Sequence, residues 1–326
     1  MKAIVQDVYG SADVLELRDV DQPPVGADDV LVQVRAAGVD PGVWILMTGR
    51  PYLARAAFGL RRPRVPARGR DVAGVVAAVG SRVTRFRPGD EVYGTCRSGS
   101  YAEYAVASWR RLAPKPAGLS FEQAAVVPVS GGTALQAVRD SARVRPGQRV
   151  MVIGAAGGVG SFAVQIARAF GATVTGVCGP ATADLVRSLG ADDVIDYTRE
   201  EVDRDGARYD AIIDMAGNRP LSLLRRAMTP RGTLVLVGGG HDSGRLLGGL
   251  HRQFSAPLVS MFTGQRLRTL MARERAEDLE ELGRLIGSGA VTPVIDRTYP
   301  LADAPDAIRH LVSGHPAGKV VVTVAA

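Results

Sequence analysis

The chain has 326 residues, of which 46% are hydrophobic and 22% are charged, and its formal net charge is +7. This composition is ordinary for a globular protein, and the length favours two domains over a single core. No run of about eighteen apolar residues could span a bilayer, and the start "MKAIVQDVYG" does not resemble a leader sequence, so we expect a cytoplasmic protein.

The positive charge argues only weakly for nucleic acid, because nearly all of it is arginine spread along the chain. The densest basic stretch is "LRRPRVPARGR" at residues 60–70. Pro63 and Pro66 exclude a recognition helix there and predict a loop. We expect a solvated loop, with a phosphate-facing loop or a nucleic-acid surface as the alternatives.

The first third of the chain predicts short strands separated by turns. Residues 29–39 alternate apolar and polar positions, residues 71–80 form a second apolar run, and residues 87–94 carry a turn into a strand. This spacing predicts a small β-rich domain that is partly barrel-like.

From about residue 118 the pattern changes to alternating helices and strands. Residues 120–142 predict a helix with Ser120 as its N-cap. The predicted strands that follow are 149–155, 173–178, 193–197, 209–217 and 233–240, and the predicted helices between them are 160–172, 183–191 and 220–232. Apolar strands alternating with helices predict an α/β domain with a doubly wound parallel sheet.

The last part of the chain breaks this rhythm. Residues 241–265 mix apolar residues with glycines, which predicts either a mobile wall of a pocket or an ordinary packed helix. Residues 265–272 predict a last strand, and residues 275–289 an amphipathic helix ended by glycine. Residues 290–326 return to strand, helix, strand, so we expect the tail to re-enter the first domain.

The strongest motif is "VMVIGAAGGVGSFAVQIA", in which Gly157, Gly158 and Gly160 lie where a strand turns into a helix. Glycines there allow the backbone to approach a pyrophosphate, and the helix N-terminus can bind it. In the usual spacing the first glycine would fall at Ala155, and Val159 completes the turn. Because the turn sits inside a strand, helix, strand unit, it predicts a dinucleotide site.

Selectivity between the nucleotides is set at the end of the next strand, in "TVTGVCGPA". An acid there binds the ribose of NAD, whereas a base or hydroxyl accepts the 2′-phosphate of NADP. This chain has Cys178 and Gly179, so no acid in this stretch repels a phosphate and no base attracts one. We expect NADP(H) to be preferred, with NAD(H) as the alternative.

Taken together, these motifs resemble a medium-chain dehydrogenase/reductase, specifically the zinc-independent quinone oxidoreductase-like group. The resemblance runs nearly end to end and includes, in family order, "YGSADVLEL", "DDVLVQVRAAGV", "RDVAGVVAAVGSRVTRFRPGDEVYG", "LAPKPAGLSFEQAAVVPV" and "GKVVVTV". It implies a GroES-like substrate domain of residues 1–117 and 276–326, and a Rossmann dinucleotide-binding domain of residues 118–275.

The resemblance also bears on metal binding. In zinc-dependent relatives two of the ligand places hold a Cys and a His, whereas this chain has Asp40 and Arg70 there. A catalytic zinc takes about three protein ligands, and a guanidinium cannot be one. Cys96 and Cys178 are too few for a four-thiolate site, and we expect both to be reduced. We therefore expect no metal.

Asp40 lies in "AGVDPGVW", between an apolar strand and a Pro-Gly turn. The residues alone leave two interpretations, a turn former or a group that faces a ligand. The resemblance implies a place beside the nicotinamide cleft, where we expect the family's Asn-Pro-x-Asp and find Asp40-Pro41-Gly42-Val43 instead. Asp40 is then either a positioning group or a catalytic acid or base.

Tyr52, in "GRPYLAR", lies where the family often has an active-site Tyr, so it either donates a proton to the substrate or is a packed aromatic. Ser130, Gly131 and Gly132 depart from the small apolar residues of the family and predict an altered pocket. The candidate pocket residues are Val43, Trp44, Ser130, Gly131 and Phe262. Further candidate cofactor-binding residues are Thr133, Cys178, Gly179, Tyr197, Gly238 and Gly239.

The function that the resemblance implies is hydride transfer between NADP(H) and a quinone, an enone or a related small carbonyl compound. One alternative is a specialised enzyme on the same fold, such as an atypical reductase, a cyclase or a dehydratase, that uses Asp40 as an acid or base. A second is a non-enzymatic cofactor- or RNA-binding protein. We expect a small-molecule substrate and a homodimer, with no membrane partner and no nucleic acid.

Overall fold

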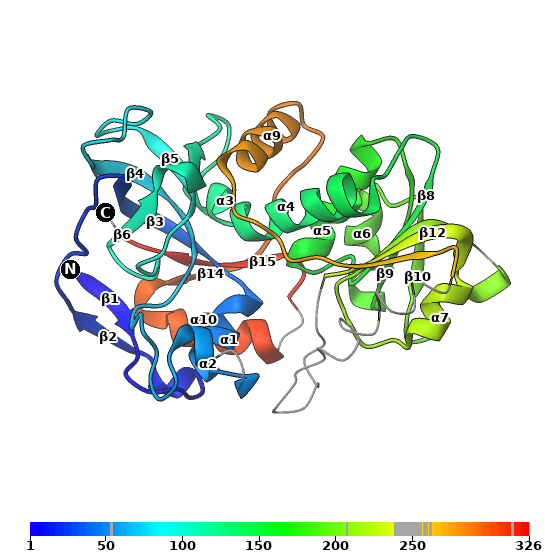
Figure 1. Ribbon diagram of the computed structural model, residues 1–326, viewed down its shortest axis with the longest axis horizontal. Helices are drawn as coiled ribbons and strands as arrows, with labels where there is room; N and C mark the ends of the chain where they lie inside the picture. Colours follow the sequence, from blue (N-terminus) through cyan, green and yellow to red (C-terminus); the bar gives the residue numbers. More distant parts are fainter. Residues whose placement is uncertain are drawn as a thin grey trace. The chain divides into compact units, whose positions relative to one another are not determined.

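The computed structural model describes residues 1–52, 55–206, 208–237, 256, 260, 263–313 and 316–325. The chain divides into two compact units. The first unit comprises Met1–Gly132, Glu274–Gly289 and Pro293–Ala326, and the second comprises Thr133–Arg273 and Ala290–Thr292. Both chain ends lie in the first unit (Figure 1). The stretch 241–265 lies almost entirely outside the described residues, so the two interpretations of it stay predictions.

The described residues of the first unit form a seven-stranded sheet in the order β14-β15-β3-β4-β5-β7, with β6 paired to β3. Its strands are β3 (Asp29–Val39), β4 (Asp71–Val79), β5 (Glu91–Thr95), β6 (Tyr104–Ser108), β7 (Leu112–Pro114), β14 (Ile295–Pro300) and β15 (Lys319–Thr323). β14 and β15 run parallel, and the other pairs run antiparallel. β1 (Lys2–Val5) and β2 (Glu16–Asp19) form a separate antiparallel pair.

The tail returns to the first unit through β15, which pairs with β3 so that Val320 lies opposite Val39. β3 was expected to alternate buried and exposed residues, but nearly all of its residues are buried. It pairs with β4, β6 and β15, and α3 also contacts it. The helices of this unit are α1 (Pro41–Thr48), α2 (Arg55–Phe58), α3 (Phe121–Ala125), α9 (Ala276–Gly287) and α10 (Ala304–Ser313).

The helix predicted over 120–142 begins as expected but is not continuous. Ser120 caps α3 through a capping box with Gln123, in which each side chain accepts the other residue's backbone N–H. The chain then breaks and continues as α4 (Pro128–Leu135) and the π-helical η4 (Gln136–Ala142). Pro128 explains the break, since it lacks an N–H and disfavours a helical residue before it. Because α3 packs on β3 and β4, these contacts assign residues 118–132 to the first unit, and the boundary expected at 118 stays a prediction.

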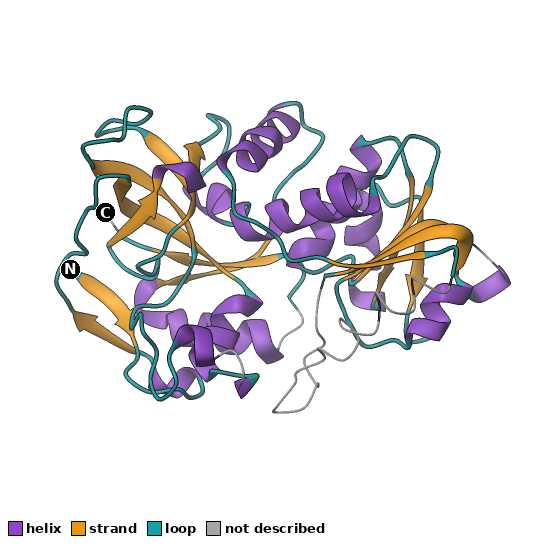
Figure 2. Cartoon of the chain, viewed as in Figure 1, coloured by secondary structure: helices purple, strands orange, loops and turns teal. Residues whose placement is uncertain are grey.

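The second unit contains six described parallel strands in the order β10-β9-β8-β11-β12-β13, flanked by helices (Figure 2). The strands are β8 (Arg149–Ile153), β9 (Thr173–Cys178), β10 (Asp193–Asp196), β11 (Tyr209–Asp214), β12 (Met228–Leu236) and β13 (Arg266–Thr269), and the helices are α5 (Gly158–Ala169), α6 (Ala183–Ser188) and α7 (Leu221–Arg226). The helix predicted over 220–232 ends early, because β12 already begins at Met228, where Pro230 favours extended backbone.

Buried side chains from several strands form the core of the second unit, among them Met151, Ile153, Ile212 and Leu234. This core fixes the edge of the sheet at which β8 ends and α5 begins. None of the helices in the described part of the chain has the length and apolarity that a bilayer crossing needs.

Candidate functional site

The turn between β8 and α5 is built from glycines that bring backbone segments close together. Gly154 has a φ of +81°, in the left-handed region that favours glycine. A Cβ on Gly160 would lie 2.0 Å from the carbonyl oxygen of Gly154, so a side chain there would push α5 away from the strand. Gly157 is the N-cap of α5 and makes no side-chain cap. The glycines therefore create a bare backbone turn.

Ala155 occupies the place of the first glycine in the usual fingerprint. Its N–H donates to the carbonyl of Val177 at 3.0 Å, and the residue is buried. A Cβ on Gly176 of β9 would lie 3.2 Å from the Cβ of Ala155. The missing side chain at Gly176 thus makes room for the extra methyl group of Ala155.

These residues fit the pyrophosphate of a dinucleotide. The first amide groups of a helix have no intrahelical partner, and the helix dipole adds partial positive charge there. Gly157, Gly158 and Val159 are partly exposed at the start of α5. The amide of Gly157 donates to the carbonyl of Gly154 at 3.1 Å, but no side chain caps this end and glycines clear the space around it, so the amides of the first turn of α5 are available to an anion.

The end of β9 brings together three predicted cofactor-binding residues. Cys178 is 4% exposed, and burial raises the pKa of its thiol. A Cβ on Gly179 would lie 3.3 Å from the hydroxyl of Tyr197, which follows β10. Tyr197 is 52% exposed, so much of this residue is open to solvent beside Gly179.

Sequence reasoning missed Asp196, which lies opposite Cys178 in the pairing of β9 and β10. Its carboxylate accepts hydrogen bonds from the amide and the hydroxyl of Thr198, at 2.9 Å and 2.7 Å. These bonds hold the pKa of Asp196 below its usual value, so the carboxylate is ionised at neutral pH. An acid is therefore present beside Cys178, although the sequence stretch around Cys178 contains none.

Asp40 is the N-cap of α1, which answers one part of the sequence-based question. Its Oδ1 accepts the amide N–H of Gly42 at 2.7 Å. The residue is only 3% exposed, and Oδ2 is buried with no hydrogen-bond partner among the described residues. One carboxylate oxygen thus holds the helix, and the other is left for a ligand or a proton.

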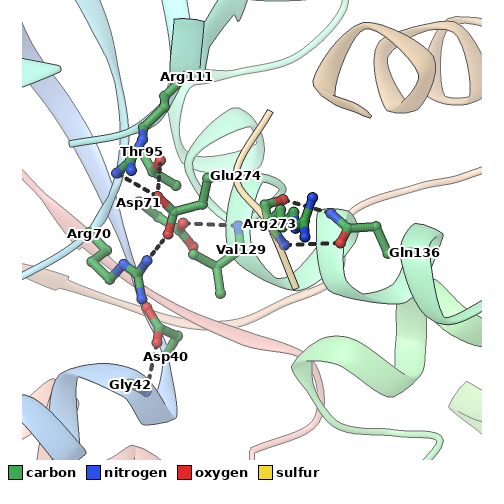
Figure 3. Close-up of polar contacts among 10 residues, drawn as sticks. All are labelled: Asp40, Gly42, Arg70, Asp71, Thr95, Arg111, Val129, Gln136, Arg273 and Glu274. Atoms are coloured by element: carbon green, nitrogen blue, oxygen red, sulfur yellow. Dashed lines mark hydrogen bonds and ion pairs between the residues drawn. The ribbon is translucent and has the colours of Figure 1, made fainter. Parts of the chain in front are cut away.

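Arg70 forms an ion pair with Glu274, a residue that sequence reasoning missed (Figure 3). Glu274 also pairs with Arg111 at 2.9 Å and accepts the hydroxyl of Thr95 at 3.0 Å. Its side chain is 16% exposed. Arg70 also lies near the carboxylate of Asp40, because both side chains approach Gly42. A Cβ placed on Gly42 would lie 2.7 Å from Oδ1 of Asp40 and 4.0 Å from Nη1 of Arg70.

Asp71, the neighbour of Arg70, is fully buried. Its Oδ1 accepts the amide N–H of Val129 at 3.0 Å, near the start of α4. Burial raises the pKa of Asp71 to about 7; the nearby cation Lys319 opposes this rise, and Asp40 adds to it. The two acids Asp40 and Asp71 therefore form a buried, electrostatically coupled pair in the first unit.

The first unit also contains a cavity of about 610 Å³, which we call the arginine cavity. Gly42, Val43, Ile45 and Leu46 of α1 line one side of it. Five arginines contribute to the lining: Arg64, Arg68, Arg70, Arg97 and Arg111. Of the predicted pocket residues, only Val43 is among the described residues that line this cavity.

The other predicted pocket residues have packing roles in the described structure. Trp44 packs against the core that includes Met47, and Ser130 is 2% exposed. A Cβ on Gly131 would lie 3.2 Å from Leu282 of α9, so close helix packing accounts for this glycine. Gly132, by contrast, has open space where a Cβ would be. A role for these residues in substrate binding stays a prediction.

Tyr52, the second candidate catalytic residue, is 41% exposed. The guanidinium of Arg55 lies 4.7 Å from the centre of its ring and 4.4 Å from that of Tyr9. Its ring is therefore held from one side by Arg55, while much of the side chain is exposed to solvent. Among the other candidates, Thr133 is half-buried near the middle of α4, and Gly238, Gly239 and Phe262 lie outside the described residues.

No group of three or more His, Cys, Asp or Glu side chains that could hold a metal occurs in the part of the chain that the structure describes. Cys96 and Cys178 are both free and buried. The expected absence of zinc stays a prediction.

Two family models match the chain. An alcohol dehydrogenase GroES-like domain matches residues 26–117, and a zinc-binding dehydrogenase matches residues 189–322. The chloroplast envelope quinone oxidoreductase homolog of Arabidopsis thaliana is 33% identical over 337 residues, which cover 99% of this chain and 98% of that protein. The mitochondrial NAD(P)H oxidoreductase RTN4IP1 of Mus musculus is 32% identical over 362 residues, covering 99% and 89%.

Solved structures show the same end-to-end similarity. The quinone oxidoreductase from Coxiella burnetii matches with a TM-score of 0.86 at 30% identity, covering 100% of this chain and 99% of that one. A structure described as an NAD-dependent alcohol dehydrogenase matches with a TM-score of 0.85 at 30% identity, covering 100% of both chains. Both units therefore have counterparts in known proteins.

Proposed function

Because the chain belongs to the quinone oxidoreductase-like group of the medium-chain dehydrogenase/reductase superfamily, we propose that it transfers hydride between NADP(H) and a quinone, an enone or a related small carbonyl compound. It is an NAD(P)H-dependent oxidoreductase of the quinone reductase type, and its α/β fold combines a GroES-like unit with a Rossmann unit, as predicted. The single observation that supports cofactor use in this chain is the bare glycine turn before α5.

The residues of the chain would bind and orient the reactants, while a bound nicotinamide would supply the hydride chemistry. Gly158 and Gly160 would hold the pyrophosphate through backbone amides, and Gly157, which has no side chain, would let it approach closely. Tyr52 is 41% exposed, and its phenol would donate a proton to the substrate oxygen. Asp40 would position the substrate through Oδ2, which the helix cap leaves unused.

The oxidation of NADPH by a panel of quinones and enones tests this function. Absorbance loss should depend on both the enzyme and the electron acceptor. Cofactor binding, followed by fluorescence, should be measured on the same preparation. If the protein binds NADPH and turns over none of the acceptors, the proposal is wrong.

One observation favours a second candidate function. The buried, unpaired Oδ2 of Asp40 suits a catalytic acid or base, as in a specialised reductase, a cyclase or a dehydratase on the same fold. Product mass spectrometry distinguishes these reactions, because a reduction adds two hydrogens, a dehydration removes water and a cyclisation by isomerisation leaves the mass unchanged. A cytoplasmic location and a homodimer stay predictions.

A further inference from the structure

We propose that the substrate carries a carboxylate, which binds in the arginine cavity with Arg68 as its counter-ion, while the apolar body of the substrate lies against α1. This inference rests on the proposed function, because it specifies the class of carbonyl compound that the same enzyme reduces. It concerns only the first unit, in which the whole cavity lies.

The lining of the arginine cavity has one sign of charge. Its five arginines are accompanied by no Asp or Glu among the described residues that line it. A cavity whose low-dielectric walls carry a single sign of charge concentrates the field inside it and attracts ions of the opposite charge. An anion therefore finds several guanidinium groups at one place, and a carboxylate matches the guanidinium fork.

Arg68 is the most deeply buried of these arginines. It is 4% exposed, and its guanidinium donates to the carbonyl oxygens of Val65 and Pro66, the latter at 3.2 Å. No carboxylate in the described structure forms an ion pair with it. Burial lowers the pKa of Arg68 to about 10, which leaves the guanidinium charged at neutral pH. Burying a charge costs free energy unless an opposite charge pairs with it, so an anion that binds beside Arg68 would offset this cost.

Two ionisable groups near Arg68, Cys96 and Tyr101, do not neutralise it. Cys96 also lines the cavity, but burial raises the pKa of its thiol to about 12. Tyr101 interacts electrostatically with Arg68, and burial raises the pKa of its phenol well above its usual value. Both groups are neutral at neutral pH, so Arg68 keeps its full charge.

The charges of two further arginines, Arg70 and Arg111, are only partly neutralised. Arg70 and Arg111 share the single carboxylate of Glu274, and the carboxylate of Asp40 lies near Arg70. The side chains of Arg70 and Arg111 are 39% and 46% exposed, which leaves them able to contact a ligand.

Arg97 pairs with Asp29, whose side chain is 7% exposed. Arg64 aside, the other four guanidiniums of the lining have three carboxylates near them, and Arg68 is the one that forms no ion pair with a described residue. One bound carboxylate would balance it. This places the anionic end of the ligand at Arg68.

The rest of the cavity wall is apolar and suits the body of a small molecule. Val43, Leu46, Phe58 and Val65 contribute to it, and the volume of about 610 Å³ lies within the usual range of small-molecule sites. Inorganic anions alone would leave these walls unfilled. A conjugated carbonyl compound with an apolar body and a carboxylate would contact both the apolar wall and the arginines of the cavity.

Binding provides the first test, on the full chain without added cofactor. The probes are the saturated ketone derived from para-carboxybenzalacetone and its methyl ester, which differ at the end that would meet Arg68 only by the negative charge and one methyl group. We expect the carboxylate to bind about tenfold or more tightly than the ester, as measured by thermal shift and calorimetry. Equal affinities in the wild-type protein overturn the inference, whatever any variant does.

Arg68→Met should abolish the preference for the carboxylate, and Arg68→Lys should keep most of it because the charge is preserved. Arg87→Met is the matched control: it removes the same charge from an exposed side chain outside the cavity, and its preference should match that of the wild type. A preference that survives in Arg68→Met refutes the assignment of Arg68.

Turnover separates this inference from the proposed function. With NADPH, kcat/KM for para-carboxybenzalacetone should exceed that for its methyl ester by about tenfold, and Arg68→Met should lose the advantage through KM. Reduction of the ester alone would refute the inference and leave the function standing. Tight carboxylate binding without reduction of any acceptor would refute the function and leave the anion site standing.

Discussion

The carboxylate of Asp71 lies 3.7 Å from the ammonium group of Lys319, and both side chains are almost completely buried. Burial nevertheless prevails over this attraction and raises the pKa of Asp71 to about 7. The ammonium group of Lys319 also donates to the carbonyl of Val39 at 3.0 Å, so its interactions are divided. The folded protein therefore holds a proton on Asp71 that the unfolded chain would release.

This raised pKa predicts that stability falls as the pH rises. Below the usual pKa of 3.8, Asp71 is protonated in both states and its contribution is fully present. Between the usual pKa and about 7, the folded state binds a proton that the unfolded state has released, so stability falls steadily with rising pH until Asp71 also ionises in the folded state. Between about pH 5 and about pH 7, the wild type should lose about 2 kcal/mol of unfolding free energy relative to Asp71→Asn, as measured by urea denaturation.

Asp71→Asn is a suitable reference because its amide oxygen can still accept the N–H of Val129. Parallel stability curves of the two proteins across this pH range would show that the carboxyl does not titrate there.

Glu274→Gln should destabilise the first unit, because it leaves Arg70 and Arg111 without the carboxylate that they share. Both arginine side chains are partly exposed, so water compensates in part and we expect a loss of about 1–2 kcal/mol. Urea denaturation measures it, and the exposed Glu201→Gln serves as the control. A loss no larger than that of the control would mean that the ion pairs contribute nothing measurable.

Gly158→Asp should abolish NADPH binding and leave the fold intact, because a carboxylate at the start of α5 occupies and repels the pyrophosphate. The matched control is Gly118→Asp, an exposed position where a Cβ meets no atom within 4 Å. A fluorescence titration measures the affinity, and circular dichroism checks the fold. Unchanged affinity in Gly158→Asp would show that the phosphates bind elsewhere.

NADPH should bind better than NADH, but by a smaller margin than in relatives that carry Ser and Arg after the second strand. Gly179 leaves room for a 2′-phosphate beside the hydroxyl of Tyr197, whereas the ionised Asp196 repels it. Asp196→Asn should therefore strengthen NADPH binding and leave NADH binding nearly unchanged. A wild-type preference for NADH of about tenfold, or about 1.4 kcal/mol, contradicts the expectation.

The sequence predicts those parts of the fold that depend on local pattern. β3 and β9 begin and end at the predicted residues, and Ser120 caps α3, because hydrophobic runs and capping residues act over a few positions. The break at Pro128 and the early start of β12 were missed, although prolines mark both. The predicted helices followed the apolar periodicity across both prolines and so missed these local signals.

The candidate site depends on contacts that no local pattern reveals. Glu274 reaches Arg70 only because the chain returns to the first unit after β13, and Asp196 reaches Cys178 only through strand pairing. The lack of a carboxylate partner for Arg68 is likewise a property of its buried surroundings, not of the stretch 60–70. That stretch was expected to be a solvated loop, yet several of its residues line the arginine cavity.

Asp40→Asn distinguishes the two roles that remain for Asp40. Asparagine is as good an N-cap as aspartate, so the bond from the Gly42 amide to Oδ1 should persist and α1 should keep its stability. The substitution therefore changes the charge and the second oxygen, Oδ2, with little else. Asp40→Ala, which should lose about 1 kcal/mol with the cap, shows how much activity depends on α1 alone.

If Asp40 is a positioning group, Asp40→Asn restores the amide expected in this family and should leave quinone reduction unchanged or improved, with NADPH affinity preserved. We expect this result, because hydride transfer to a quinone needs no obligatory carboxylate. If Asp40 is a catalytic acid or base, turnover should fall by about a hundredfold or more, in line with general acid-base contributions. A loss of that size, with cofactor binding intact, would instead favour the specialised chemistry, since the buried Oδ2 would then be the atom that exchanges the proton.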